Sequence, residues 1–333
     1  MKNMKEYLKE DQLNFFSLEE FAPHDDLKKQ VKKGFSSLHK SLCSGCFYNY
    51  EGSLLFDKIC ELPEYYLTRT ELAVLEDNMG DIIAEIPEQA IITELGNGNP
   101  VKIKLFFEAL FQRQNRVQYT PIDISIQYMA QSMRRLIEQY PNLQITAIGG
   151  RYEDGIHFLQ KTDAPKCILW LGSSIGNLTD NKAVDFLSKI SRMMQPEDSL
   201  LIGMDMIKDW EIIDAAYNDA QGITAAFNMN LLRRINNNLD ADFNLAQFRH
   251  EPVCNKAESR MESYITSCKD QQVSIRDLDM EVSFKENERI HVEVSCKYSE
   301  EKIATIADRS GLRLKSRWFD TRKWFSLNLF SPA

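Results

Sequence analysis

The chain of 333 residues is too long for one small core and comfortable for two domains, or for one domain with a large insertion. Its hydrophobic content of 43% and charged content of 27% are ordinary for a soluble globular protein. The formal net charge of -9 argues against a general nucleic-acid-binding or anionic-membrane-binding protein, because both classes need clustered lysine and arginine.

The N-terminus and the cysteines favour a cytoplasmic protein. Charged residues rather than an apolar segment follow Met1, and no apolar run reaches the roughly 18–20 residues that a membrane span needs. The seven cysteines are odd in number and irregularly spaced, so we expect free thiols. Cys43 and Cys46 form one close pair, but no second pair of cysteine or histidine stands at zinc spacing. We therefore expect no metal site.

The first part of the chain combines polar helices with aromatic clusters. Residues 1–45 are polar and look helical, with an amphipathic helix over 26–38, and an aromatic stretch around a glycine turn follows at 47–56. Thr68 and Glu71 have the spacing of a capping box, so a helix is predicted to begin there. Aromatic clusters usually pack in a core, although tyrosine hydroxyls also suit the lining of a pocket.

The most informative stretch opens a βαβ unit. An apolar run over 91–95 leads into a Gly96-x-Gly98 turn, and an amphipathic run follows over 102–113. Glycines permit positive φ and a close approach of the backbone to a nucleotide-like ligand. A dinucleotide-binding fingerprint needs a third glycine three residues after the second, and Val101 stands there instead. The form Glu-Leu-Gly-x-Gly resembles the first motif of S-adenosylmethionine-dependent methyltransferases.

The alternation of strands and helices then continues. Strands are predicted over 117–123 and 143–148, with a helix over 127–139 between them. The first of these strands ends in Asp123, which can accept both hydroxyl groups of a ribose or can cap the following helix. The continuous apolar run over 167–171 is typical of a central parallel strand that is buried on both faces.

A glycine-rich loop over 172–178 follows, at the edge where open parallel sheets bind their ligands. Residues 205–270 then interrupt the alternation, and we interpret them as an insertion that closes over the sheet, with a long helical stretch over 209–238. The other expected elements are helices over 182–194 and 299–310 and strands over 199–204, 260–267, 274–283, 290–298, 312–319 and 324–330. A terminal hairpin after a parallel sheet is how methyltransferase sheets of the main class close.

Polar residues alternate with apolar ones in the strand over 290–298. The period of two puts His291, Glu293, Ser295 and Lys297 on one face. On this pattern alone, the strand is half-exposed and its polar face is solvated.

Taken together, the motifs resemble the histidine Nα-methyltransferases of ergothioneine biosynthesis, a family of S-adenosylmethionine-dependent enzymes that act on amino-acid α-amines. The resemblance spans roughly residue 45 to the C-terminus. It is carried by Phe47-Tyr48 with Gly52-Ser53-x-Leu55-Phe56, Leu62-Pro63-Glu64-Tyr65-Tyr66 with Thr68-Arg69-Thr70-Glu71, Glu94-Leu95-Gly96-x-Gly98, Gly172-Ser173-x-Ile175-Gly176-Asn177-Leu178, Ala216-Tyr217 with Gly222-x-Thr224-Ala225-Ala226-Phe227-Asn228, and Glu293-Val294-Ser295-Cys296-Lys297.

This resemblance implies an α/β fold with a Rossmann-like class I methyltransferase sheet and a second, smaller α+β substrate-binding domain. We expect the S-adenosylmethionine-binding domain over 60–205 and 270–333, and the substrate-binding domain over 10–59 and 206–269.

The resemblance also assigns site residues by position. The residues expected to bind the cofactor S-adenosylmethionine are Gly96, Lys102, Asp123, Arg151 and Tyr152. The residues expected to bind the amino acid are Tyr48, Tyr65, Gly172, Asn177, Tyr217, Thr224, Glu293 and Ser295. Of these, Tyr48 would act at the amine as the catalytic residue, and Glu293 would set the preference for histidine.

The chain departs from the family pattern at three positions. Arg151 stands where an aspartate usually meets the adenine amino group, and an arginine cannot accept that hydrogen bond. Ser263 replaces a methionine near the substrate, which could enlarge the pocket and shift the side chain that it accepts. Asn49 stands where an aspartate is usual.

We expect methylation of L-histidine to its trimethylated betaine, hercynine. The alternatives are the same chemistry on tryptophan, tyrosine or a modified histidine, and a binding protein that has kept this fold but lost catalysis. An NAD-dependent oxidoreductase is a weaker hypothesis, because the third glycine of the dinucleotide-binding fingerprint is missing. The expected partner is a small amino acid, without nucleic acid or membrane, and we expect a monomer.

Overall fold

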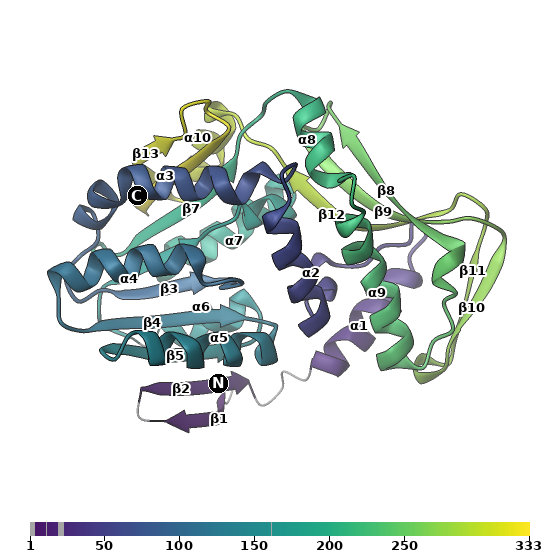
Figure 1. Cartoon of the computed structure of the whole chain (residues 1–333), viewed down its shortest axis with the longest axis horizontal. Coiled ribbons are helices and arrows are strands. Elements are labelled where there is room, and N and C mark those ends of the chain that lie inside the picture. Colours follow the sequence, from purple (N-terminus) through teal and green to yellow (C-terminus); the bar gives the residue numbers. More distant parts are fainter. Residues whose placement is uncertain (1–3, 11, 19–22, 161) are drawn as a thin grey trace. The chain divides into compact units, whose positions relative to one another are not determined.

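A computed structural model of the protein describes residues 4–10, 12–18, 23–160 and 162–333 (Figure 1). These residues form two compact units, which are treated separately below. The first unit is made of the described residues of Met1–Glu20, with Leu67–Ile207 and Lys297–Ala333. The second is made of the described residues of Phe21–Tyr66, with Lys208–Cys296.

Nine strands of the described chain form one sheet in the first unit, in the order β1-β2-β5-β4-β3-β6-β7-β14-β13. Their bounds are β1 Met4–Glu10, β2 Leu13–Leu18, β3 Ile91–Leu95, β4 Val117–Asp123, β5 Leu143–Gly149, β6 Lys166–Trp170, β7 Ser199–Asp205, β13 Leu312–Phe319 and β14 Phe325–Pro332. The strands from β2 to β7 in this order pair in parallel, whereas β1, β14 and β13 pair antiparallel to their neighbours.

The strand order reverses direction in the middle of this sheet. From β3 the chain moves outward through β4 to β5, and it then returns to β6 on the other side of β3. In open parallel sheets, ligands bind outside the carboxyl ends of the strands at such a reversal. The fold therefore places a candidate site at the carboxyl ends of β3 and β6.

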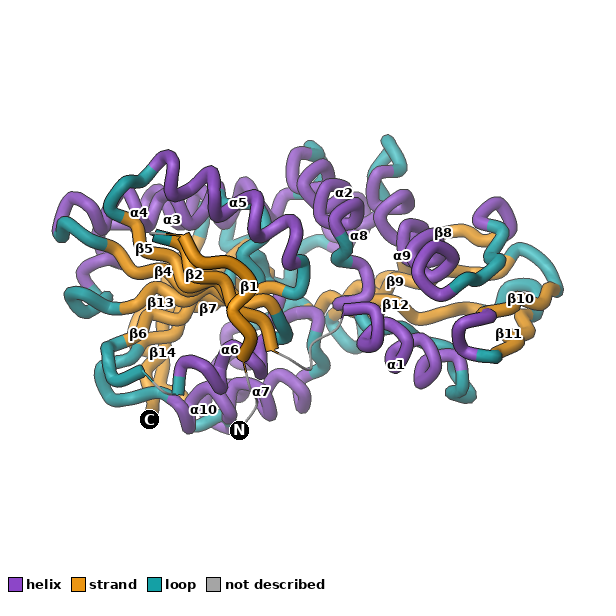
Figure 2. Tube along the Cα trace, turned by 90° about the horizontal axis from the view of Figure 1, so that it is seen from below, coloured by secondary structure: helices purple, strands orange, loops and turns teal. Residues whose placement is uncertain are grey.

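Helices cover both faces of the sheet (Figure 2). One face carries α3 Tyr66–Ala84, α4 Val101–Arg113 and α5 Ile126–Gln139, and the other carries α6 Tyr152–Leu159, α7 Asp180–Met193 and α10 Glu300–Arg309. The fully buried Val74, Phe106 and Met129 show that one continuous core joins α3, α4 and α5 to the central strands. This confirms the predicted α/β sheet with its terminal hairpin.

The second unit combines helices with small antiparallel sheets. Its elements are α1 Pro23–Phe35, η1 Ser44–Phe47, α2 Tyr50–Glu61, α8 Trp210–Tyr217, α9 Ile223–Leu239, η3 Leu245–Gln247, β8 Phe248–Asn255, β9 Arg260–Ser267, β10 Gln271–Ile275, η4 Arg276–Leu278, β11 Met280–Phe284 and β12 Arg289–Cys296. Three strands pair in the order β12-β9-β8, and β10 pairs with β11. Aromatic rings hold η1 and α2 against α9, because Phe227 of α9 packs 4.7 Å from Phe47 of η1 and 5.9 Å from Phe56 of α2 between ring centroids.

Two predictions for the N-terminal part were wrong. Residues 4–10 and 13–18 form β1 and β2 rather than helices, because Leu13 and Phe15 are fully buried against the sheet where β2 pairs with β5. Residues 1–3, 11 and 19–22 lie outside the described part of the chain. The predicted capping box is also absent: α3 begins at Tyr66, so Thr68 lies inside the helix.

Two other predicted elements are each divided into two in the structure. The long helical stretch over 209–238 is two helices, α8 and α9, and Gly222 caps the second in the left-handed conformation with φ +71°. The strand predicted over 274–283 is the two-stranded β10–β11 hairpin.

A β-bulge corrects the predicted polar face of β12. His291 pairs with Tyr264 of β9, but Glu293 pairs with Ser263 rather than Glu262, so the extra residue in β12 shifts the alternation by one. His291 therefore faces the opposite side from Glu293. Residues 297 and beyond have left the strand, which ends at Cys296.

The division into units also differs from the expected domain boundaries. Residues 270–296 were expected with the first unit, but they belong to the second. The reason is pairing, because β12 forms a ladder with β9 along its whole length. Among the described residues, no helix is long and apolar enough to cross a membrane.

Candidate active site

The glycine turn after β3 is built for close approach of a ligand to the backbone. Gly96 has φ +77° and Gly98 has φ +41°, the left-handed region that side chains rarely adopt. A Cβ atom on Gly96 would lie 2.6 Å from the hydroxyl oxygen of Tyr152. The structure thus brings together two residues that the sequence assigned to the cofactor.

Asp123 ends β4 beside this turn. It is half-buried, and its Oδ1 accepts a hydrogen bond of 2.7 Å from the backbone N–H of Ser125. Burial raises the pKa of the carboxyl, and the backbone N–H groups of Ser125 and Gly98 oppose that rise. The sequence left two roles open for Asp123, the binding of a ribose and the capping of the next helix. The N-cap residue of α5 is Ser125 and not Asp123.

Glu94 supplies a second carboxyl at the end of β3. Its side chain is buried and accepts a hydrogen bond from the Tyr119 hydroxyl. Burial raises its pKa from 4.5 to about 8, although Tyr119 and Lys102 favour the charged form. A cationic ligand at this edge would favour ionisation of Glu94.

Arg151 and Tyr152 begin α6 at the same edge of the sheet. The Arg151 backbone N–H donates to Asp154 Oδ2 at 3.1 Å, which closes the first turn of the helix. The Tyr152 ring packs edge-on against Trp170, with 5.9 Å between centroids, and burial raises the pKa of its hydroxyl. Tyr152 is therefore held against the sheet with its hydroxyl at Gly96.

The loop after β6 contains two residues predicted to bind the amino acid. Gly172 has φ +72°, and Asn177 is half-buried at the end of the 3-10 helix η2 Ser174–Asn177. Gly172 lies against Lys102, whose Nζ would be 3.3 Å from a Cβ atom at that position. Both residues belong to the first unit.

The other residues predicted to bind the amino acid lie in the second unit. The Tyr217 hydroxyl is 2.7 Å from Ser295 Oγ, and the rings of Tyr217 and Tyr65 are 6.5 Å apart. Burial raises the pKa of the Tyr65 hydroxyl, and the nearby Tyr217, Tyr48 and Glu293 side chains raise it further. These five side chains therefore form one cluster, which we call the tyrosine cluster.

Helices α2 and α9 and strand β12 of the second unit hold this cluster in place. The Tyr48 ring packs against Phe56 of α2 and Phe227 of α9, with 5.9 and 5.8 Å between centroids. Glu293 and Ser295 share one face of β12, because the bulge precedes both of them. Thr224 lies in the first turn of α9, where its backbone N–H donates to Asp219 at 2.8 Å.

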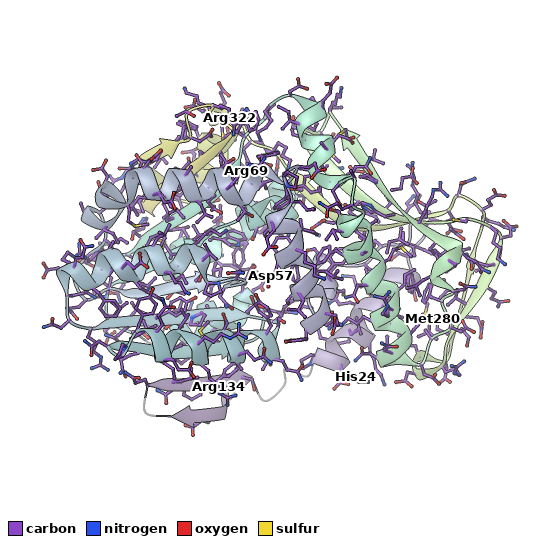
Figure 3. The ribbon with its side chains drawn as sticks, viewed as in Figure 1. His24, Asp57, Arg69, Arg134, Met280 and Arg322 are labelled. Atoms are coloured by element: carbon purple, nitrogen blue, oxygen red, sulfur yellow. The ribbon has the colours of Figure 1, made fainter. Side chains whose placement is uncertain are left out.

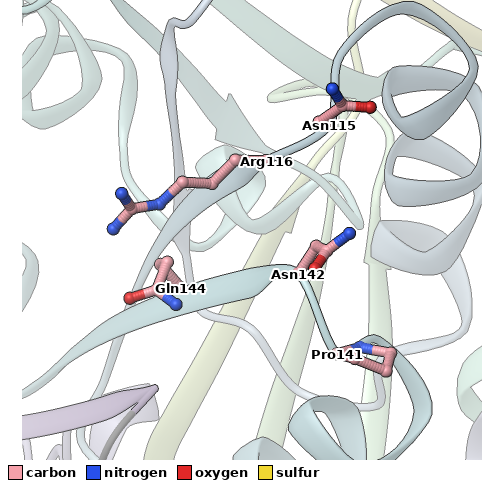
Figure 4. Close-up of a pocket in the computed structure, with 5 residues that line it drawn as sticks. All are labelled: Asn115, Arg116, Pro141, Asn142 and Gln144. Carbon is pink, nitrogen blue, oxygen red and sulfur yellow. The ribbon is translucent and has the colours of Figure 1, made fainter.

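A cavity of about 270 Å³ lies elsewhere on the first unit (Figure 4). It is lined by Asn115, Arg116, Pro141, Asn142 and Gln144, which precede or begin β4 and β5. It therefore opens at the amino ends of the strands, opposite the edge that carries the glycine turn. Among the described residues, no group of three His, Cys, Asp or Glu side chains is placed to hold a metal ion.

Sequence reasoning missed two residues at the carboxyl edge. Glu71 was read as part of a capping box, but it is fully buried and pairs with Lys102 at 2.7 Å. Tyr119 was read only as part of a strand, but its hydroxyl binds Glu94. No local signal marked Glu71, because its burial depends on Lys102 and Gly172, which lie far away in the sequence.

The sheet order, the glycine turn and the acid at the end of the second strand define an S-adenosylmethionine-dependent methyltransferase of the Rossmann-like class. The turn fits that donor, because a Cβ atom at Gly98 would meet nothing within 4 Å, which leaves the backbone open there, and the carboxyls of Glu94 and Asp123 stand at the ends of the two adjoining strands. A family described as histidine-specific methyltransferase, SAM-dependent, matches residues 27–332. The chain belongs to this family.

Three relatives are similar over most of the chain. A histidine N-alpha-methyltransferase of Mycolicibacterium smegmatis is 36% identical over 303 residues, which are 91% of this chain and 94% of the relative. One of Mycobacterium tuberculosis is 33% identical over 94% of this chain and 97% of the relative. Ergothioneine biosynthesis protein 1 of Neurospora crassa is 32% identical over 81% of this chain and 31% of the relative.

Proposed function

We propose that the protein transfers methyl groups from S-adenosylmethionine to the α-nitrogen of L-histidine, up to the trimethylated betaine hercynine. The observation that carries this proposal is the tyrosine cluster, in which Glu293 and Ser295 share one strand face and Ser295 bonds to Tyr217. A neutral imidazole presents one donor and one acceptor, which a carboxylate and a hydroxyl can satisfy together. Membership of a histidine-specific family supports the same substrate.

We assign the methyl donor to the first unit. The Gly96-x-Gly98 turn would approach it closely, because the space at Gly98 is open, Asp123 would accept the ribose hydroxyls, and Lys102 would meet its carboxylate. When bound, the donor supplies a methyl group that its sulfonium already activates. The protein residues therefore need mainly to align the reactants and exclude water.

We assign the amino-acid side chain to the tyrosine cluster of the second unit. From the family resemblance alone, we also propose that Asn177 binds the substrate carboxylate. The amine must lose its proton before it is methylated. Because an α-amino group has a pKa of roughly 8, part of it is neutral near pH 7–8 and no strong base is needed. Tyr48 orients the nitrogen, and water accepts the proton.

Mass spectrometry tests this function directly. Purified protein is incubated with S-adenosylmethionine and each of the twenty amino acids separately. Products on histidine alone, with one, two and three added methyl groups, are expected. A product that stops at one or two methyl groups would contradict the trimethylation step. No product with any amino acid, together with no donor binding, would favour the non-catalytic binding protein.

The same chemistry on another amino acid is the second candidate, and the register of β9 favours it. Ser263 lies directly opposite Glu293, so a small polar side chain borders the residue proposed to bind the imidazole. The matched variants are Ser263→Met, which restores the family residue, and Ser283→Met on the distant β11. If the pocket is rebuilt around Ser263, the first variant changes the preferred amino acid and the second does not.

A further inference from the structure

A buried carboxylate joins three segments of the first unit at the point where the strand order reverses. Glu71 lies two residues after Arg69 on α3, whose label marks this part of the helix in Figure 3. Its side chain is 0% exposed, and its Oε2 lies 2.7 Å from Lys102 Nζ on α4. The backbone N–H of Gly172, in the loop after β6, donates to both carboxylate oxygens at 2.9 Å.

The space around Glu71 is shaped for this group. A Cβ atom at Gly203 of β7 would lie 2.2 Å from Glu71 Oε1, so only glycine leaves room for the carboxylate there. Gly172 has φ +72° and lies against the Lys102 ammonium. Glu71 thus holds a cation and a left-handed glycine peptide in one arrangement.

A buried ion pair adds little net stability, because desolvation of both charges offsets their attraction. An apolar residue at this buried position of α3 would avoid the desolvation cost of the charges. The ion pair is therefore better explained by what it holds in place than by stability. Lys102 keeps 19% of its side chain exposed, whereas Glu71 is fully covered. The carboxylate therefore stands behind the lysine, on the protein side of the candidate donor site.

We propose that Glu71 is a positioning residue for methyl transfer: it fixes the Lys102 ammonium for the donor carboxylate and pins the Gly172 peptide that begins the loop to Asn177. This inference rests on the proposed roles of Lys102 and Asn177. Glu71 itself touches neither reactant. It acts through the lysine and through the loop, so its two contacts can be separated by substitution.

Glu71→Gln separates the two contacts. The amide keeps an oxygen that accepts from the Gly172 N–H but loses the charge that holds Lys102. We expect binding of S-adenosylmethionine, measured by titration calorimetry without amino acid, to weaken about tenfold or more, the usual effect of losing a charged hydrogen bond. Binding of histidine should change less than threefold. In Glu71→Ala both contacts are lost, and we expect both affinities to fall.

Two controls distinguish positioning from general stability. Asp198 is an equally buried acid that pairs with Lys166 at 3.4 Å, at the amino end of β6. Asp198→Asn should lower the unfolding temperature without changing donor affinity. In a Lys102→Gln background, Glu71→Gln should weaken donor binding by less than twofold further, because the group through which it acts is gone.

Each outcome of these binding measurements either supports or overturns the positioning role of Glu71. Donor affinity within twofold of the wild type for folded Glu71→Gln would overturn the proposal and leave Glu71 a structural residue. If Glu71→Gln does not fold, Glu71→Asp decides, because it keeps the charge but withdraws the carboxylate by one methylene group. Unchanged donor affinity in that variant would also overturn it. Failure of the wild type to bind the donor would instead refute the proposed function.

Discussion

The buried carboxyl of Glu94 makes stability depend on pH in a way that one substitution can test. In the folded protein, burial raises its pKa from 4.5 to about 8. Between these values, the folded state holds a proton that the unfolded chain has released. The contribution of Glu94 to stability is therefore fully present below pH 4.5 and is lost as the pH rises through 8.

The size of this effect follows from the two pKa values. Between pH 6 and pH 9, the contribution of Glu94 falls by about 3 kcal/mol. Glu94→Gln removes it, because an amide does not titrate, and the amide oxygen can still accept from Tyr119. The variant should therefore become progressively more stable relative to the wild type as the pH rises.

Differential scanning calorimetry of the ligand-free proteins at pH 6, 7, 8 and 9 measures this. For 333 residues, a change of 3 kcal/mol corresponds to roughly 4 °C in the difference between the two unfolding temperatures. Tyr119→Phe is the control, because loss of the hydroxyl that lowers the pKa of Glu94 should move the fall in stability to higher pH. A difference between wild type and Glu94→Gln that stays constant from pH 6 to 9 would refute the reasoning.

Three further predictions test other parts of the structure. Lys297→Met should lower the free energy of unfolding in urea by about 3–5 kcal/mol. The reason is that Asp205 is fully buried and would lose the ammonium that lies 2.7 Å from its carboxylate. A loss below about 1 kcal/mol would show that the pair is not desolvated. Asn177→Ala should weaken histidine binding by about 1.5–3 kcal/mol in calorimetry, through loss of a charge-assisted contact; unchanged affinity would remove its proposed role. Tyr217→Phe removes the hydroxyl 2.7 Å from Ser295 Oγ and should weaken histidine binding by about 1 kcal/mol. Ser295→Ala in that background should then add little, whereas two full and additive losses would show that the residues act separately.

The sequence by itself determined the order of the central elements. Short apolar runs such as 167–171 are typical of a strand buried on both faces, and the Gly96-x-Gly98 turn favours positive φ whatever the surrounding fold. These requirements are local, so the sequence predicts these elements without knowledge of the tertiary structure. The predicted strands β3, β4, β6 and β7 accordingly appear within a residue or two of their expected bounds.

Parts of the candidate site were also within reach of the sequence. Gly96 and Tyr152 were both assigned to the donor, and the structure places the hydroxyl of one against the other. Tyr217 and Ser295 were both assigned to the amino acid, and they share a hydrogen bond across 78 positions of the chain. These assignments came from the family resemblance, because neither composition nor periodicity indicates which residues that are distant in sequence lie close together.

Only the tertiary structure decided the remaining features, and each depends on a partner far away in sequence. Residues 4–10 and 13–18 form strands because β5 offers a pairing edge, which overrides their polar composition. The bulge in β12 arises from its register with β9, and it moves Glu293 away from the face of His291. Glu71 has the spacing of a helix cap, but a lysine 31 residues later and a peptide 101 residues later make it a buried anchor. Local patterns specify which elements form, whereas pairing and burial between distant segments specify which side chains meet.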